Sequence, residues 1–131
     1  MVIDTSAIFA ILNDEPEAER FAEAISSDSV RLMSSATALE IFILVRARKG
    51  EPGITLLKQF LKEAKIDIID FDESQFQIAV YAFENYGKGM NKPGKLNFGD
   101  CFSYALSIAT DEPLLFKGND FSQTDLKIAL T

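Results

Sequence analysis

Short apolar runs alternate along the chain with longer stretches in which apolar residues recur at helical spacing. Runs such as "MVI" and "IDII" have the length of strands, whereas "EIFILVRAR" shows the helical period. Strands that alternate with helices favour a parallel sheet covered on both faces. We therefore expect an α/β protein: a three-layer α/β/α sandwich with a mostly parallel central sheet, formed as a single domain over residues 1–131.

The expected elements follow one another in a regular order. Strands are expected at residues 1–4, 30–33 and 66–71, within 113–120, and as a short fifth strand at 126–130. Helices are expected at 5–12, from Asn13 onward with Pro16 in the first turn, and at 35–49, 54–65, 72–86 and 98–110. The aromatic residues that recur at helical spacing are expected to pack in the core: Phe42, Phe76, Phe83, Phe102 and Tyr104.

The chain contains no histidine and a single cysteine, Cys101, which we expect to be a buried small hydrophobe. These counts exclude His-based acid–base catalysis, Ser-His-Asp and Cys-His nucleophile systems, zinc ribbons and iron–sulfur clusters. Catalysis would have to use carboxylates, Lys, Tyr, Ser or Thr, or a metal held by oxygen. No apolar run reaches the roughly 20 residues that span a bilayer. The N-terminal residues lack the features of a secretion signal, so we expect a cytoplasmic protein without a membrane partner.

Four acidic residues fall where an open α/β sheet places its binding site. Asp4 follows the first expected strand and Asp120 follows the fourth. Glu40 lies early in the helix after the second strand, and Asp100 begins the helix after the Gly-rich segment 87–97. Because binding sites in such sheets lie beyond the carboxyl ends of the strands, these four carboxylates are expected to converge there.

Clustered carboxylates raise one another's pKa unless a positive charge lies between them. A bound Mg²⁺ or Mn²⁺ would supply that charge, and a fixed Lys or Arg is the alternative. Each acid also has a purely structural interpretation: Asp4 and Asp100 at helix N-termini, Glu40 in a capping box with Thr37, and Asp120 in a turn. An all-carboxylate set in a chain without histidine favours the metal.

Four segments resemble the PIN-domain nucleases and, more narrowly, the VapC toxins of toxin–antitoxin pairs: "MVIDTSAIFAIL", "SSATALEIFILV", "LNFGDCFSYALS" and "PLLFKGNDFSQTDL". The match follows the whole chain in order, and its last two segments are the most specific. The resemblance implies an α/β/α sandwich whose acidic cluster binds Mg²⁺ or Mn²⁺ and hydrolyses RNA. It also implies a cognate antitoxin protein that holds the enzyme inactive, and a homodimer.

On this resemblance, Asp4, Glu40 and Asp100 match the three most regular acids of the family and are expected to hold the metal and act in catalysis. A small hydroxyl residue after the first acid orients that acid or a metal-bound water in the family. Either Thr5 or Ser6 matches this position, and Ser6 is the favoured one.

The fourth acid of the family is more variable, and Asp120 matches it. In this chain the dipeptide Asn119-Asp120 stands where many relatives carry a Thr-rich turn with Asp. Asn119 or Asp125 could therefore share or replace the role of Asp120 at this position.

The net charge of −7 argues by itself against a nucleic-acid partner. If four of the acids hold metal, however, the pocket is neutralised locally and the objection weakens. The basic residues that could meet RNA phosphates are Arg46, Arg48, Lys49, Lys92, Lys95 and Lys117.

Two other functions are compatible with the sequence. A receiver-like phosphoacceptor module shares the size and the acids at strand ends, and Asp70 would then have to be the acceptor after the third strand. Such a module would leave Glu40 and Asp100 without a role. A non-catalytic binding module that keeps the PIN fold is the second alternative, against which the four intact acids argue.

Overall fold

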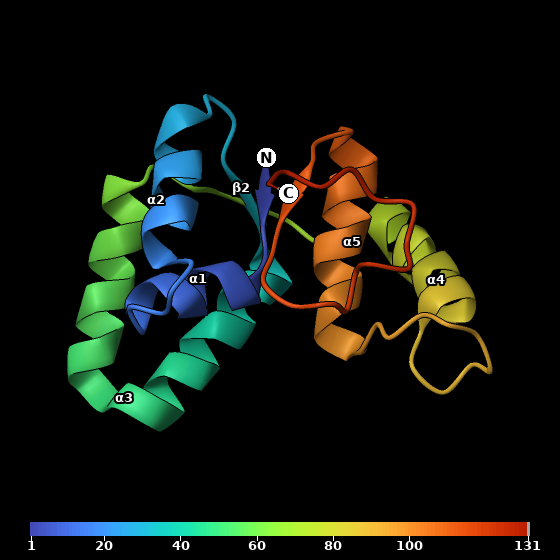
Figure 1. Ribbon diagram of the computed structural model, residues 1–131, viewed down its shortest axis with the longest axis horizontal. Helices are drawn as coiled ribbons and strands as arrows, with labels where there is room; N and C mark the ends of the chain where they lie inside the picture. The colour runs from blue at the N-terminus through green and yellow to red at the C-terminus, as the bar shows by residue number, and fades with distance from the viewer. Residues whose placement is uncertain (131) are drawn as a thin grey trace.

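In the computed structural model, which describes residues 1–130, a small parallel sheet runs through the centre of the molecule (Figure 1). Its strands are β1 (Val2–Ile3), β2 (Leu32–Ser34), β3 (Asp67–Ile69) and β4 (Leu114–Leu115). The strand order is β3-β2-β1-β4 and every pair is parallel. β1 therefore lies between two neighbours, and the residue after it stands at the middle of the carboxyl edge.

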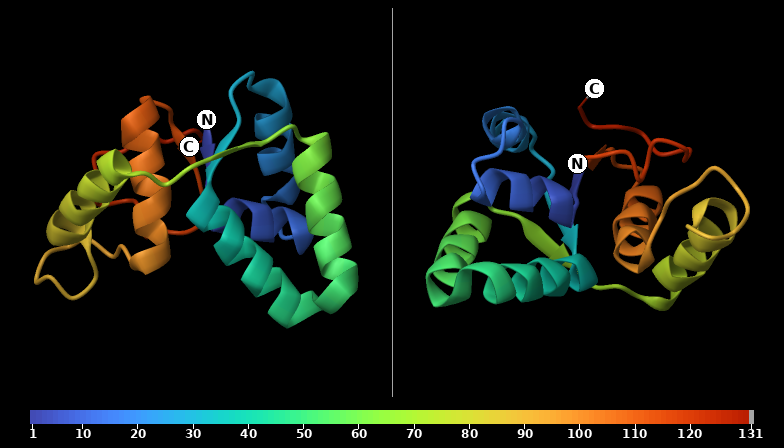
Figure 2. Two further views of the ribbon diagram at one scale, coloured as in Figure 1. Left: turned by 180° about the vertical axis from the view of Figure 1, so that it is seen from behind. Right: turned by 60° about the horizontal axis from the view of Figure 1, so that its bottom comes forward.

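Helices cover both faces of the sheet, which confirms the expected three-layer sandwich. They are α1 (Thr5–Leu12), α2 (Ala18–Ser27), α3 (Ser35–Glu63), α4 (Glu73–Tyr86) and α5 (Phe98–Thr110). Figures 1 and 2 show α1, α2 and α3 on one side of the strands and α4 and α5 on the other. Within residues 1–130, no helix is both long enough and apolar enough to cross a bilayer.

The strand residues alternate between two hydrophobic clusters, as the two-residue period of a strand requires. Ile3 and Leu115 pack in the cluster under α1, α2 and α3, whereas Val2 and Leu114 pack in the cluster under α5. All four side chains are buried. Burial of each contributes about 1.5–3 kcal/mol to folding, so even two-residue strands are held firmly between the layers.

Most of the expected elements match to within one or two residues at each end, and three differ by more than that. The second helix begins at Ala18, and Pro16 lies in the turn before it. The expected helices at 35–49 and 54–65 are joined in α3, with a break at Gly50, whose φ of 62° and ψ of −156° are not helical. The expected fifth strand at 126–130 is reduced to one parallel bridge, in which Ile128 pairs with Leu114.

The expected burial of the helix aromatics is only partly right. Tyr104 is buried and Phe102 is half-buried, but Phe42, Phe76 and Phe83 are exposed. The reason is that α3 and α4 are outer elements, so only one side of each helix meets the core. Cys101 is buried in the α4–α5 layer, as expected.

Candidate active site

A cavity of about 460 Å³ lies at the edge of the sheet where β1 and β4 end. The structure brings all four sequence-predicted acids to it from different parts of the chain. Its lining consists of Asp4, Thr5, Ser6, Phe9, Glu15, Glu40, Leu44, Arg48, Asn97, Asp100, Lys117, Gly118 and Asp120. The convergence follows from parallel strands, whose carboxyl ends all meet at one edge.

Asp4 is the most tightly held of the acids. It directly follows β1, is buried, and is the N-cap of α1 because its Oδ2 accepts from the Ser6 N–H at 3.1 Å. The Ser6 hydroxyl donates to the same oxygen at 2.7 Å, and the Ser103 hydroxyl of α5 donates to Oδ1 at 2.5 Å. Both carboxylate oxygens therefore have fixed partners, which determine how their remaining lone pairs face the cavity.

Glu40 reaches the cavity from the second turn of α3. Its Oε1 accepts a hydrogen bond from the Thr5 hydroxyl at 2.6 Å. The capping-box interpretation of Thr37 and Glu40 is wrong, because α3 begins earlier and its N-cap is Ser34. A Cβ atom added at Gly99 would lie 2.1 Å from Glu40 Oε2, so the absence of a side chain at Gly99 allows Glu40 to lie in this position.

Asp100 combines a structural and a chemical position. It forms a true capping box with Asn97: the Asn97 N–H donates to Asp100 Oδ2 and the Asp100 N–H donates to Asn97 Oδ1, each at 3.0 Å. Burial raises the pKa of its carboxyl to about 7. The hydrogen bond from Asn97 opposes this shift, whereas the charges of Asp4 and Asp120 add to it.

The fourth position is occupied by Asp120, which lines the cavity after the turn at Gly118. Asn119 is exposed and is absent from the cavity lining. Asp125 faces another part of the molecule, where its Oδ1 accepts from the Tyr104 hydroxyl at 2.7 Å. The geometry therefore favours Asp120 over both alternatives for the fourth acid.

The donor chemistry of this cavity fits a hard divalent cation. Carboxylate oxygens are the ligands that Mg²⁺ and Mn²⁺ prefer, and a cation would offset the burial and the neighbouring charges that together raise the pKa of Asp100. Among residues 1–130, no three Asp, Glu or Cys groups already stand at ligand spacing. A bound metal would therefore have to draw some of these side chains closer together, and waters would complete its coordination shell.

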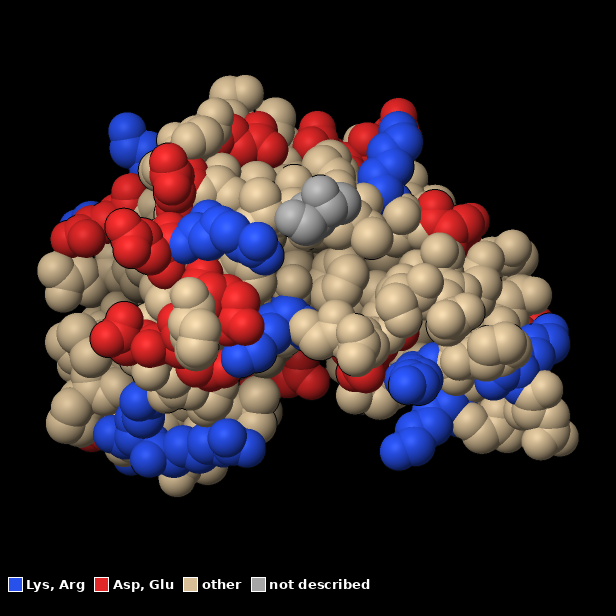
Figure 3. All heavy atoms as spheres, in the orientation of Figure 1, with Lys and Arg blue, Asp and Glu red and all other residues tan. Residues whose placement is uncertain are grey.

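The basic residues are distributed unevenly around the cavity. Figure 3 shows basic side chains over the lower part of α3 and below α5, with acidic side chains between them. Of the predicted RNA contacts, Lys117 lines the cavity and is paired with Glu15 and Glu17. Arg48 also lines it. Among the described residues, those that stay outside the lining are Arg46, Lys49, Lys92 and Lys95.

Several residues of the site were not anticipated from the sequence. Ser103 follows Asp100 by three positions, a spacing that puts both on one helix face and could have identified it. Gly99 could have been recognised only from the approach of Glu40, which is a tertiary contact. Asp70, which a receiver-like module would need, lies outside the cavity lining.

Replacement of Gly99 by Ala tests the position of Glu40. The new Cβ should push the Glu40 carboxylate away from Thr5 and lower the affinity of the cavity for Mg²⁺ about tenfold. The melting temperature should hardly change, because the displaced atoms are the far end of a flexible side chain. In a Glu40→Gln background Gly99→Ala should have no further effect, and additive losses would contradict this account.

Comparison with known proteins agrees with this geometry. A family model described as PIN domain matches residues 1–127. Ribonuclease VapC30 of Mycobacterium tuberculosis is 49% identical over 126 residues, which cover 96% of this chain and 95% of that protein. Ribonuclease VapC of Mycolicibacterium smegmatis is 48% identical over 126 residues, with 96% and 97% covered.

Solved structures share the fold at lower sequence identity. The crystal structure of VapC20 from Mycobacterium tuberculosis superposes with a TM-score of 0.76 at 16% identity, covering 95% of each chain. VapBC2 from Rickettsia felis gives a TM-score of 0.74 at 19% identity, covering 97% of this chain and 94% of that chain. The PIN-domain model matches nearly the whole chain, and two VapC ribonucleases share almost half of its aligned residues. Together with the acidic cavity, these matches show that the chain belongs to the PIN-domain family and, within it, to the VapC ribonucleases.

Proposed function

We propose that the chain is a metal-dependent endoribonuclease, the toxin of a VapBC-type toxin–antitoxin pair. The observation that carries this proposal is the convergence of Asp4, Glu40, Asp100 and Asp120 on one cavity at the carboxyl edge of the sheet. The relatives named ribonuclease VapC support RNA as the substrate. The solved VapBC complexes support a protein antitoxin as the partner.

When bound, Mg²⁺ or Mn²⁺ supplies positive charge for the scissile phosphate and lowers the pKa of a water. Asp4 offers this ion oxygens that Ser6 and Ser103 hold in place. Glu40 offers a carboxylate that Thr5 orients. One of the carboxylates takes the proton of the attacking water, and in-line attack leaves 5′-phosphate and 3′-hydroxyl ends. The protein thus contributes carboxylate oxygens that its own hydroxyl groups hold in place.

The direct test is digestion of RNA by the wild type with Mg²⁺, with Mn²⁺, and with EDTA. Asp4→Asn and Asp100→Asn should both abolish cleavage, and EDTA should abolish wild-type cleavage. Asp70→Asn removes the same charge from an exposed position outside the cavity, so it should cleave like the wild type. Equal cleavage by all of these proteins, with or without EDTA, would refute the mechanism.

Arg48 is the basic residue best placed to meet RNA at this cavity. Its guanidinium lies over the Phe9 ring, 5.0 Å from the centroid, and both residues line the cavity. Among the described residues, Arg48 has no acidic ion-pair partner, whereas Arg46 of the same helix pairs with Glu51. Arg48 can therefore bind a phosphate next to the scissile one, and stacking on Phe9 limits the entropy that this contact costs.

Replacement of Arg48 by Gln should raise KM for RNA about tenfold and leave kcat nearly unchanged. The salt dependence of RNA binding should also become shallower by about one phosphate contact. Arg46→Gln is the matched control, since it removes an arginine that is already paired outside the cavity. Equal losses in both variants would show a general charge effect instead of a specific contact.

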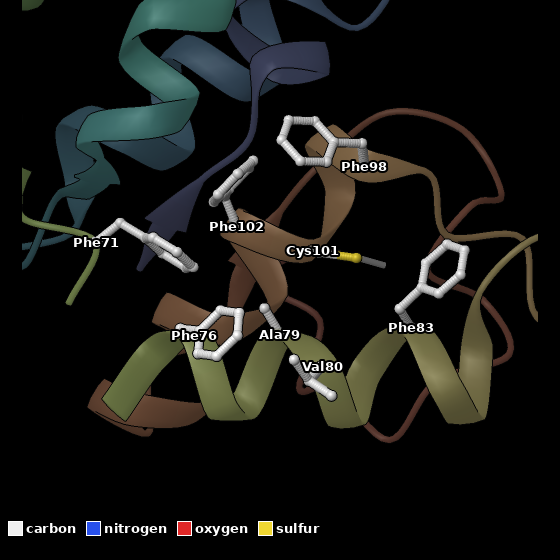
Figure 4. A pocket seen from close by; sticks show the side chains of 8 residues that line it. All are labelled: Phe71, Phe76, Ala79, Val80, Phe83, Phe98, Cys101 and Phe102. Carbon is white, nitrogen blue, oxygen red and sulfur yellow. The ribbon is translucent and has the colours of Figure 1, made fainter. Parts of the chain in front are cut away.

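The antitoxin has an apolar surface available beside the active site. Figure 4 shows aromatic side chains around a hollow of about 580 Å³ between α4 and α5. A second hollow of about 390 Å³ lies between α3 and α5. Phe98, 80% exposed, lines both hollows and immediately precedes Gly99 and Asp100. Exposed apolar surface of this kind is typical of a protein contact. A chain bound in the second hollow would lie beside the acidic cavity, because Glu40 and Leu44 line both.

Phe98→Ser should weaken binding of the cognate antitoxin at least about tenfold, because it removes the central aromatic side chain of this surface. Titration calorimetry with purified antitoxin measures the change. Leu56→Ser is the control, since Leu56 is also apolar and exposed but lies on α3 outside both hollows. Unchanged antitoxin affinity with loss of a homodimer in light scattering would instead assign the surface to a second copy.

A further inference from the structure

Lys117 lies in the segment between β4 and Asp120, and its side chain is held by two acids from the other end of the chain. Its ammonium contacts Glu15 Oε1, 102 residues away in sequence, and lies 3.1 Å from Glu17 Oε2. Both acids stand in the connection between α1 and α2. The two carboxylates raise the pKa of Lys117, and Lys117 in turn lowers the pKa of both acids, so all three groups are charged at neutral pH.

The connection between α1 and α2 is shaped around this contact. Glu17 is the N-cap residue of α2, yet its side chain makes no capping hydrogen bond. Its Oε2 is buried and lies 3.1 Å from the Lys117 ammonium. A buried carboxylate oxygen is costly unless it is paired, so the ion pair accounts for an orientation that helix capping does not.

The backbone of Lys117 is part of the support of Asp4. Its N–H donates to the Ser6 Oγ at 2.9 Å. Since Ser6 Oγ accepts there, its own proton is free for Asp4 Oδ2, to which it donates at 2.7 Å. A chain of contacts thus runs from the two glutamates through Lys117 and Ser6 to the first acid of the site.

The same segment also delivers the fourth acid. Gly118 follows Lys117 with a φ of 100°, which turns the backbone toward the cavity that Asp120 lines. Displacement of Lys117 would therefore alter two carboxylates at once: Asp4, through Ser6, and Asp120, through the turn.

We propose that Glu15 and Glu17 are positioning residues that clamp Lys117 and thereby hold residues 116–120 against Ser6, setting the orientation of Asp4 and Asp120. The catalytic consequence rests on the proposed nuclease function. The clamp also gives Lys117 a role other than contact with RNA, because two carboxylates already occupy its ammonium.

The experiment compares three changes with the wild type: the double change Glu15→Gln with Glu17→Gln, Lys117→Met, and Lys117→Arg, which keeps the charge. Lys127→Met is the matched control, because Lys127 forms an exposed ion pair with Asp111 away from the cavity. Three quantities are measured: hydrogen exchange of the Lys117 amide without metal, Mg²⁺ affinity by calorimetry, and kcat and KM for RNA.

The double change and Lys117→Met should accelerate exchange of the Lys117 amide about tenfold or more, since its bond to Ser6 would open more often. Mg²⁺ affinity should fall about tenfold, and kcat should fall with KM little changed. Lys117→Arg keeps the positive charge, so its amide exchange, Mg²⁺ affinity and kcat should stay close to the wild-type values. Lys127→Met should match the wild type in all three.

The proposal is overturned if the double change lowers KM for RNA while amide exchange, Mg²⁺ affinity and kcat stay at wild-type values. That result would make Lys117 a substrate contact that the glutamates merely compete for. If the wild type cleaves no RNA, the nuclease proposal fails, and amide exchange and Mg²⁺ affinity still decide the existence of the clamp.

Discussion

Without metal at pH 8, Asp100→Asn should be more stable than the wild type. With metal present, the same variant should cleave RNA at least about a hundredfold more slowly than the wild type. The reason for the gain in stability is that ionised Asp100 is buried beside Asp4 and Asp120, which raises its pKa to about 7. Asn keeps the shape of the side chain, and its oxygen can still accept from the Asn97 N–H. The variant therefore loses the unfavourable charge and keeps the capping box.

The pH dependence follows from the direction of this pKa shift. In the unfolded chain Asp100 ionises near its ordinary value, and in the folded chain it ionises near pH 7. Between these values the folded state binds more protons, so stability falls as pH rises from about 4 to about 7. The full cost is present above pH 7. It is about 4 kcal/mol as an upper bound and of the order of 1–3 kcal/mol once water in the open cavity is allowed for.

Thermal unfolding with EDTA measures the effect, and the expected rise in melting temperature at pH 8 is about 3–8 °C. The difference should vanish at about pH 3 and below, where Asp100 is protonated in both the folded and the unfolded chain. Mg²⁺ should reverse the order, because it stabilises only the protein that can bind it. Asp70→Asn is the control for a general loss of negative charge. A lower melting temperature for Asp100→Asn at pH 8 without metal would show that the ionised Asp100 carboxylate does not destabilise the folded protein.

The position of the acidic cluster could be predicted because it depends on local rules. Asp4 follows an apolar strand, and parallel strands bring their carboxyl ends together. For Asp4 and Asp100, the structural and functional interpretations also turn out to be compatible. Asp4 caps α1 and Asp100 closes a capping box, and both still line the cavity. Capping preferences therefore bring acids to the edge of the sheet where a metal can use them.

The features that the sequence does not predict depend on contacts between distant parts of the chain. From the sequence Lys117 is a candidate RNA contact, because nothing near it shows that Glu15 and Glu17 will face it. The apolar stripes of α3 and α4 predict burial, but a stripe does not reveal where the core ends, and Phe76 remains exposed. Of the helix starts, the second is the one that the sequence misplaces: it is expected from Asn13 onward, whereas α2 begins only at Ala18.

Ser103→Ala should lower Mg²⁺ affinity about 10- to 100-fold and reduce kcat/KM for RNA in proportion. Ser103 is fully buried on α5, and its hydroxyl donates to Asp4 Oδ1 at 2.5 Å. Among the side chains of the described residues, this is the bond that fixes Oδ1, as Ser6 fixes Oδ2. Its loss would leave a buried carboxylate oxygen free to rotate out of the orientation that a metal needs, at a cost in stability of about 1–3 kcal/mol.

Ser107→Ala separates the loss of a buried hydrogen bond from the loss of metal orientation. Ser107 lies one turn further along α5, is equally buried, and donates to the Glu112 carbonyl at 2.6 Å, away from the cavity. Its replacement should lower the melting temperature by a similar amount and leave Mg²⁺ affinity unchanged. Calorimetric titration of both variants distinguishes the two effects. If both lose Mg²⁺ affinity equally, Ser103 acts through the stability of α5 alone; if only Ser103→Ala does, its hydroxyl sets the geometry of Asp4.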